Sequence, residues 1–188
     1  MIICADDYGI TEKVSEAIVD LVSMSRISET SCMITRPNIK NNINSLLAYK
    51  NDINIGLHLT LTDFDSITKF NADKKLPTYK NLLLSSLKKD ISINLINDEI
   101  NSQLDSFENI FGFSPNFIDG HHHVQQLPII NDCLIKIVKD RYLDNNYWIR
   151  NSGKSFTKLI RYNKYFLKTF ALSVVGNKFK KKLNNNTI

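Results

Sequence analysis

The chain has 188 residues, of which 43% are hydrophobic and 23% are charged. This length suits one domain with a single core, and the composition is that of a globular protein, not of a disordered or fibrous one. The formal charge of +5 is spread unevenly: residues 1–144 hold 14 Lys and Arg and all 19 Asp and Glu, whereas residues 145–188 hold 10 basic residues and no acid. The basic character belongs to the C-terminal segment, and we expect no nucleic-acid partner.

The three cysteines, Cys4, Cys32 and Cys133, are widely spaced and form no Cys-x-x-Cys pair. This pattern is typical of reduced, partly buried thiols, so we expect a cytoplasmic protein. The N-terminus lacks the layout of a signal peptide, and no run reaches the ~18 apolar residues that a membrane span needs. We therefore expect no membrane span, and a homodimer is the assembly that we keep open.

Strand and helix patterns alternate along the chain. Short apolar runs predict strands, and apolar residues that recur every three or four positions predict amphipathic helices between them. The expected elements are a strand over 1–5, a helix over 12–25, a strand over 27–35, a helix near 39–47, a strand over 53–61, a helix over 95–111, a strand over 116–119, a helix over about 127–141, a strand over 147–150 and helix from 154 onward. This alternation indicates an α/β fold with a parallel sheet and helical crossovers.

Residues 62–92 interrupt the alternation. They are polar and rich in lysine, and they contain Pro77. A loop of this length in a compact domain is usually a lid or a binding insertion. We expect this segment to select the substrate, although it holds no motif that names one.

Polar residues gather where the expected strands end. In chain order they are the pair Asp6 and Asp7, then His58, then Asp119 with His121, His122 and His123, and finally Arg150. Because the carboxyl ends of parallel strands lie on one rim of a sheet, these side chains are expected to converge there. Three adjacent histidines beside a carboxylate then indicate a metal centre better than a surface loop.

Asp7, His58 and one histidine of the cluster, preferably His121, are the expected ligands of one divalent ion, because catalytic centres commonly use three protein ligands and leave a position for water. Asp6 is the expected general base. Neighbouring strand residues point to opposite faces, so both aspartates can serve one site only if the pair lies at the strand's end. Arg150 can anchor a carboxylate, either that of Asp6 or that of a product.

Each of these residues alone has a simpler interpretation. The Asp6–Asp7 pair can start a turn and cap a helix, His58 can be a hydrogen-bonded core histidine, and Arg150 can be a structural ion-pair partner. The combined pattern is harder to explain in this way. His122 is expected to pack or hydrogen-bond behind His121.

Three segments resemble the motifs of the YdjC-like carbohydrate deacetylases: Ala5-Asp-Asp-Tyr-Gly9, Gly56-Leu-His-Leu-Thr60 and Asp119-Gly-His-His-His-Val124. Residues 27–33 also resemble the second-strand segment of that family, and order and rough spacing agree over about residues 1–150. The resemblance implies a distorted (β/α) TIM-like barrel that removes an N-acetyl group from an amino sugar. It also implies that Asp7, His58 and His121 bind the metal and, by similarity with NodB-type polysaccharide deacetylases, that Asp6 is the base.

The resemblance implies magnesium, whereas two imidazole ligands favour zinc or another transition metal, so we expect one divalent ion of open identity. Members of this family normally continue well beyond residue 188, with further strands and a late group suspected as general acid. We therefore expect an incomplete barrel in one domain over 1–188, with a basic, mostly helical segment over 151–188. His123 is then the candidate proton donor.

Three functions remain open. The leading one is a metal-dependent hydrolase that deacetylates an N-acetylated saccharide. Another barrel metallohydrolase, such as an amidohydrolase that uses the His121-x-His123 pair, ranks lower because that pair normally ends the first strand. The third is a non-catalytic remnant that binds a sugar or a partner.

Overall fold

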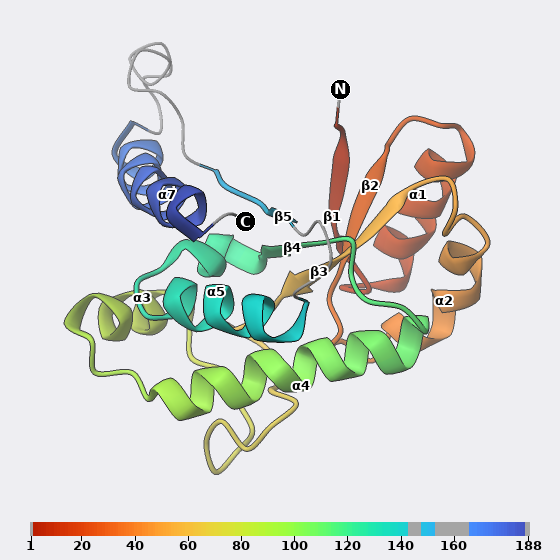
Figure 1. Ribbon diagram of the computed structural model, residues 1–188. Helices are drawn as coiled ribbons and strands as arrows, with labels where there is room; N and C mark the ends of the chain where they lie inside the picture. The colour runs from red at the N-terminus through yellow and green to blue at the C-terminus, as the bar shows by residue number, and fades with distance from the viewer. Residues whose placement is uncertain (1, 143–147, 153–165, 187–188) are drawn as a thin grey trace.

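The fold is a parallel sheet with helices along one side, shown in Figure 1 by a computed structural model that describes residues 2–142, 148–152 and 166–186. The strands are β1 (Cys4–Tyr8), β2 (Glu29–Cys32), β3 (Asn54–Leu59), β4 (Phe117–Gly120) and β5 (Trp148–Ile149). The helices are α1 (Glu12–Ser23), α2 (Ile39–Leu47), α3 (Tyr79–Lys88), α4 (Ile93–Phe111), the 3₁₀ helix η1 (His121–Gln126), α5 (Ile130–Arg141) and α7 (Phe166–Asn186). All strand pairs are parallel, and their order in the sheet is their order in the chain. The predicted α/β fold with a parallel sheet is confirmed.

The structure differs from the predictions in the first strand, which runs over Cys4–Tyr8 and not 1–5, and in two helical segments. Helix α3 lies inside the segment 62–92 that was expected to be irregular, and it begins after Thr78, whose hydroxyl accepts a hydrogen bond from the backbone N–H of Asn81. The helix expected from about residue 127 begins at Ile130, because η1 fills the preceding turn. Predicted elements at residues 147 and 154–165 lie outside the described residues.

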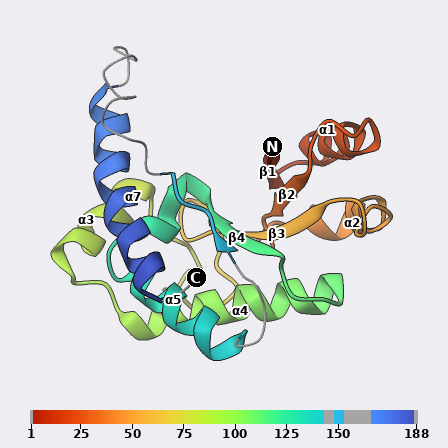
Figure 2. The same ribbon diagram turned by 45° about the horizontal axis from the view of Figure 1, so that its top comes forward.

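The helices pack side by side along one surface of the sheet. Helix α1 contacts α2, α2 contacts α4, α4 contacts α5, and α5 contacts α7 (Figures 1 and 2). The core lies between these helices and the strands, with fully buried residues such as Ile55, Leu57, Ile100, Leu104 and Ile118. Sequential parallel strands with an outer row of helices are the arrangement of a (β/α) barrel.

The sheet curves strongly although β1 and β5 are its two edges. Arg150, directly after β5, reaches Asp6 on β1, with Nη1 2.7 Å from both carboxylate oxygens. The same nitrogen lies 2.9 Å from Oδ2 of Asp119 on β4. Among the described residues the sheet is therefore an open, curved segment, which agrees with an incomplete barrel.

Side-chain alternation explains why buried strands carry polar residues. On β3, Ile55, Leu57 and Leu59 belong to the apolar core, whereas Gly56 and His58 point to the opposite face. Gly56 faces the ring of Phe117 on β4. The concave face therefore carries Phe117 beside Gly56 and polar groups such as His58 toward the carboxyl ends of the strands, and the convex face supplies the apolar core.

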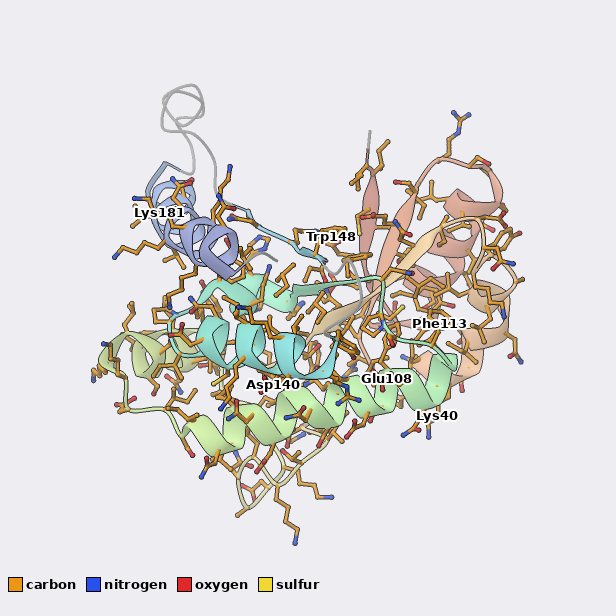
Figure 3. The ribbon with its side chains drawn as sticks, in the orientation of Figure 1. Lys40, Glu108, Phe113, Asp140, Trp148 and Lys181 are labelled. Atoms are coloured by element: carbon orange, nitrogen blue, oxygen red, sulfur yellow. The ribbon has the colours of Figure 1, made fainter. Side chains whose placement is uncertain are left out.

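Replacing Gly56 by alanine is expected to lower the free energy of unfolding by about 1–3 kcal/mol, because it overpacks this face. A Cβ at position 56 would lie 2.6 Å from the Phe117 ring. That ring has little freedom to move, since it stacks on Trp148 (labelled in Figure 3) with centroids 4.5 Å apart. Urea denaturation measures the loss. Combining the change with Phe117→Leu should cost less than the sum of the single changes, and an additive result would contradict the close contact.

Helix α7 docks on α5 and η1 (Figure 2). Phe179 and Leu183 are buried, and Lys182 donates to Asn131 and Asp132 on α5. Part of the basic charge of the C-terminal segment is therefore used in an internal contact. No helix in the described ranges is long and apolar enough to cross a membrane. All three cysteines are free thiols.

Candidate active site

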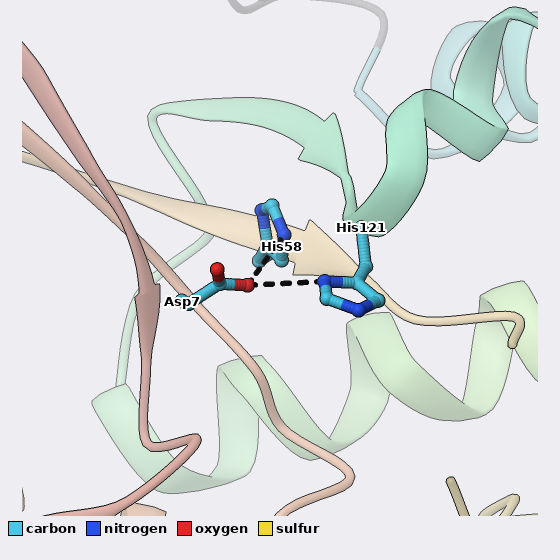
Figure 4. A group of neighbouring side chains, drawn as sticks. All are labelled: Asp7, His58 and His121. Atoms are coloured by element: carbon cyan, nitrogen blue, oxygen red, sulfur yellow. Dashed lines mark hydrogen bonds and ion pairs between the residues drawn. The ribbon is translucent and has the colours of Figure 1, made fainter. Parts of the chain in front are cut away.

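Three side chains meet at the carboxyl ends of β1, β3 and β4 (Figure 4). Oδ1 of Asp7 lies 3.1 Å from Nε2 of His58 and 3.1 Å from Nδ1 of His121. These are the predicted metal ligands, and the structure brings all three together. His58 is 4% exposed, so this ring is fixed inside the protein.

The donor set of these residues fits a divalent ion. Their three ligand atoms all lie within 4.8 Å of one another. Ligand bonds of about 2.0–2.2 Å place neighbouring donor atoms about 3 Å apart, which matches the two 3.1 Å separations. Hydrogen bonds from His121 and His58 hold the pKa of Asp7 well below its usual value, so Asp7 is an ionised carboxylate.

The backbone of β1 explains how the adjacent aspartates both reach the site. The pair lies inside β1 and not at its end, so the predicted explanation, a position at the strand's end, is wrong. The pairing with β2 shifts register between Ala5 and Tyr8, and Asp7 adopts a left-handed φ of 69°. This irregularity changes the direction of the Asp7 side chain, as β-bulges beside active sites do. A non-glycine residue held at positive φ is also typical of functional sites.

His58 is held by partners behind it. Its Nδ1 lies 2.8 Å from Oδ1 of Asp119, its direct neighbour across the β3–β4 pair, and 3.1 Å from the Ser31 hydroxyl. Ser31 in turn donates to Asp119 Oδ2 at 3.0 Å. A hydrogen bond at Nδ1 fixes the ring so that Nε2 faces Asp7, the geometry typical of metal-binding histidines.

This arrangement also controls the proton on His58. Burial alone lowers the pKa of the imidazole, but hydrogen bonds to Asp119 and Asp7 outweigh burial and raise it to about 9. Without a metal, the ring is therefore an imidazolium between two carboxylates. Because a metal ligand must be a neutral imidazole, metal binding would displace one of its protons.

Replacing Asp119 by asparagine is expected to weaken divalent-metal affinity about 10–100-fold, the usual effect of losing the carboxylate behind a histidine ligand. Asparagine keeps the size but removes the charge that stabilises His58. Calorimetric titration with Zn²⁺ measures the change. Ser31→Ala is the matched control, because it removes an uncharged hydroxyl that contacts the same pair and leaves the carboxylate in place. Wild-type affinity in the Asp119 variant would contradict this role.

Asp6 and Arg150 form the second part of the site. Nη1 of Arg150 lies 2.7 Å from both oxygens of Asp6 and 2.9 Å from Asp119 Oδ2. Cys4, Asp6 and Asp119 also lie close enough to suggest a cation site, but the guanidinium already supplies the positive charge. These carboxylates raise the pKa of Arg150 although burial lowers it, so the arginine is always charged.

The other two histidines have different surroundings, and both adopt left-handed φ angles. His123 Nδ1 lies 3.1 Å from the Ser152 hydroxyl, and burial lowers the pKa of its ring. The ring of His122 contacts that of His121, with centroids 4.1 Å apart, but it is not buried behind it. Its side chain is 45% exposed, and its Nδ1 lies 3.3 Å from Asp63 Oδ2.

Asp6, Asp7 and the histidines of the site line one cavity of about 450 Å³. Its lining comprises Asp6, Asp7, His58, Tyr79, Gly120, His121, His122 and His123. This volume is in the range of small-molecule sites. All the predicted site residues except Arg150 line it, and Arg150 contacts it through Asp6.

The roles of several residues of the site were not predicted from the sequence. Strand alternation could have identified Ser31 and Asp119, because both fall on the same face as His58. Gln125 and Gln126, expected only to start a helix, are buried and hold the chain after β5: Gln125 donates to the Arg150 carbonyl, and Gln126 accepts from the Ser152 N–H. No sequence signal identifies these two contacts.

Comparisons with known proteins agree with the predicted resemblance. The family model described as YdjC-like protein matches residues 1–187. Chitooligosaccharide deacetylases of Yersinia pestis bv. Antiqua (strain Angola) and Yersinia pseudotuberculosis serotype O:3 (strain YPIII) are each 28% identical over 145 residues. These matches cover 76% of this chain and 57% of each relative, so the chain spans little more than half of their length.

A crystal structure from Enterococcus faecalis V583, assigned as a candidate cellobiose-phosphate cleavage protein, has the same fold. It superposes with a TM-score of 0.69 at 20% identity, over 90% of this chain and 63% of that one. The family match extends through α7, beyond the 1–150 range of the motifs. The chain therefore belongs to the YdjC-like protein family.

Proposed function

We propose that the chain is a metal-dependent N-deacetylase that acts on an N-acetylated amino sugar or small oligosaccharide. The observation that carries this proposal is the convergence of Asp7, His58 and His121 beside Asp6, a carboxylate that is not part of the triad. A carbohydrate substrate is supported by the names of the Yersinia relatives.

A divalent ion held by Asp7, His58 and His121 would polarise the acetamide carbonyl and lower the pKa of a bound water. Asp6 would take the proton of the attacking water. Arg150 orients this carboxylate through its ion pair, and Asp6 still lines the cavity with its side chain 38% exposed. The positive charge of Arg150 would also favour binding of the acetate product.

We assign His123 as the candidate donor of the proton that the leaving amine needs. Its ring lines the same cavity, and Ser152 fixes its orientation. The role requires the imidazolium form, which is the minor one at neutral pH because burial lowers the pKa of His123. Replacing His123 by asparagine should lower kcat and leave metal affinity unchanged; wild-type kcat would exclude the role.

The experiment that tests the proposed function is acetate release from N-acetylglucosamine and its oligomers, with Mg²⁺, with Zn²⁺ and with a chelator. We expect release that disappears with the chelator and returns when the preferred ion is added. Two imidazole ligands favour zinc, whereas the family resemblance favours magnesium, so the two ions are compared directly. No release with either ion, together with no calorimetric metal binding, would favour a non-catalytic sugar-binding or partner-binding protein.

The amidohydrolase alternative has less support. The His121-x-His123 pair would have to bind one ion. Among the described residues, the donors that converge on Asp7 come from His58 and His121, whereas His123 pairs with Ser152.

A further inference from the structure

A row of four aromatic rings runs from beside the metal triad along the cavity. Phe64 and His121 have centroids 5.6 Å apart, His121 and His122 are 4.1 Å apart, and His122 and Tyr79 are 5.2 Å apart. The last three rings line the cavity, together with the polar groups of Asp6 and Asp7. The site thus combines an aromatic wall with carboxylates, which suits a ligand with an apolar face and polar edges.

Tyr79 stands on a rigid support. It is the first residue of α3, and this helix is fixed by the buried Leu82 and by Ser86, whose hydroxyl donates to the Pro128 carbonyl at 2.7 Å. Burial raises the pKa of the phenol, so Tyr79 is a neutral donor. Its hydroxyl has no hydrogen-bond partner among the described residues and is available to a ligand.

The segment before Tyr79 is held in place as firmly. Backbone bonds join Asp63 to Pro77 and Leu76 to Phe64, so the two ends of this loop lie together. The fully buried Glu99 of α4 accepts hydrogen bonds from the backbone N–H groups of Ile67 and Thr68. The loop is therefore a fixed wall and not a loose insertion.

His122 links this wall to the metal triad. Its Nδ1 lies 3.3 Å from both the Thr62 hydroxyl and Asp63 Oδ2, and its ring meets Tyr79 at an interplanar angle of 65°. These contacts fix the distance between the catalytic end of the row, at His121, and its far end, at Tyr79.

We propose that Tyr79 is the platform for the sugar unit next to the one that carries the reacting acetamide, so that it selects an oligosaccharide over a monosaccharide. This inference rests on the proposed function, because the acetamide must lie at the His121 end of the row. The ring of His122 lies between those of His121 and Tyr79. A sugar unit bound at Asp7, His58 and His121 therefore places the next sugar unit over Tyr79. The pyranose presents its C–H face to the ring and its hydroxyls to the phenol.

The test compares kcat/KM for N,N′-diacetylchitobiose and N-acetylglucosamine in the wild type, Tyr79→Ala and Tyr79→Phe, with the preferred divalent ion present. Tyr79→Ala is expected to lower kcat/KM for the disaccharide by about tenfold, the scale of a lost aromatic contact, and for the monosaccharide several-fold less. Tyr79→Phe should keep the preference for the disaccharide. Tyr49→Ala is the matched control, because it removes another half-buried tyrosine that does not line the cavity.

Calorimetric binding of the disaccharide, measured in an Asp6→Asn background, separates this inference from the proposed function. Acetate release with equal losses on both sugars, or with no loss, overturns the platform and leaves the function standing. Disaccharide binding that depends on Tyr79 without acetate release from the wild type supports the platform and overturns the function. If the wild type neither binds the disaccharide nor releases acetate, both this inference and the proposed function are overturned.

Discussion

Replacing His58 by alanine is expected to abolish both divalent-metal binding and acetate release. The change removes one of three converging ligands, and it also leaves Asp7 and Asp119 without the positive ring that lies between them. We expect metal affinity to fall by more than the about 10–100-fold that follows loss of a partner behind a ligand. Calorimetric titration with Zn²⁺ and Mg²⁺ measures the loss of binding, and acetate assays at the metal concentration that saturates the wild type measure the loss of activity.

Asp7→Ala should give the same double loss, since Asp7 Oδ1 is the atom shared by both histidine contacts. His122→Ala is the matched control for metal binding: it removes a histidine of the same cluster whose Nδ1 faces Asp63 and not Asp7. Thermal unfolding of each variant shows that the fold persists. Wild-type metal affinity and activity in either the His58 or the Asp7 variant would disprove the metal centre.

The convergence of Asp7, His58 and His121 could be predicted from the sequence because each lies near the carboxyl end of a recognisable strand. Parallel strands bring their carboxyl ends to one rim, so positions 7, 58 and 121 converge whatever the details of the loops. This inference needs only the order and type of the elements, which apolar periodicity supplies. Element boundaries could be off by a few residues without separating the ligands.

The backbone irregularities of the site could not be predicted in this way. Asp7, His122 and His123 all adopt positive φ, a conformation that is uncommon for non-glycine residues and that apolar periodicity cannot locate. The bulge at Asp7 lets both aspartates reach the site from inside a strand, and the turns at His122 and His123 direct their Nδ1 atoms toward Asp63 and Ser152 and not toward Asp7. Tertiary contacts impose these conformations, as at other strained functional sites.

Helix α3 was missed for a different reason. Leu82, Leu83 and Leu84 are consecutive, so the segment lacks the three-to-four-residue spacing that distinguishes an amphipathic helix. Only Thr78, as an N-cap, gave a local signal. Missing this helix hid Tyr79, and with it the aromatic wall of the cavity.

Replacing Asp6 by asparagine is expected to lower kcat for acetate release by about 10²–10⁴-fold, the usual contribution of a general base, while metal affinity stays close to that of the wild type. Asp6 does not belong to the triad, and its position is fixed by Arg150, which keeps a second partner in Asp119. Asparagine retains the size and one oxygen acceptor but cannot take a proton. Acetate assays at saturating metal and sugar give kcat, and calorimetry gives the metal affinity.

Two further variants make the Asp6 result specific. Asp52→Asn, an exposed carboxylate remote from the cavity lining, should leave kcat unchanged. Arg150→Lys keeps the charge but loses the planar guanidinium that contacts Asp6 and Asp119 together, so kcat should fall less than in Asp6→Asn. Wild-type kcat in Asp6→Asn would show that another residue is the general base. Loss of metal binding would show that Asp6 is needed for the metal site. Only a loss of kcat with metal retained assigns the two adjacent aspartates to different tasks, Asp7 to the metal and Asp6 to the proton.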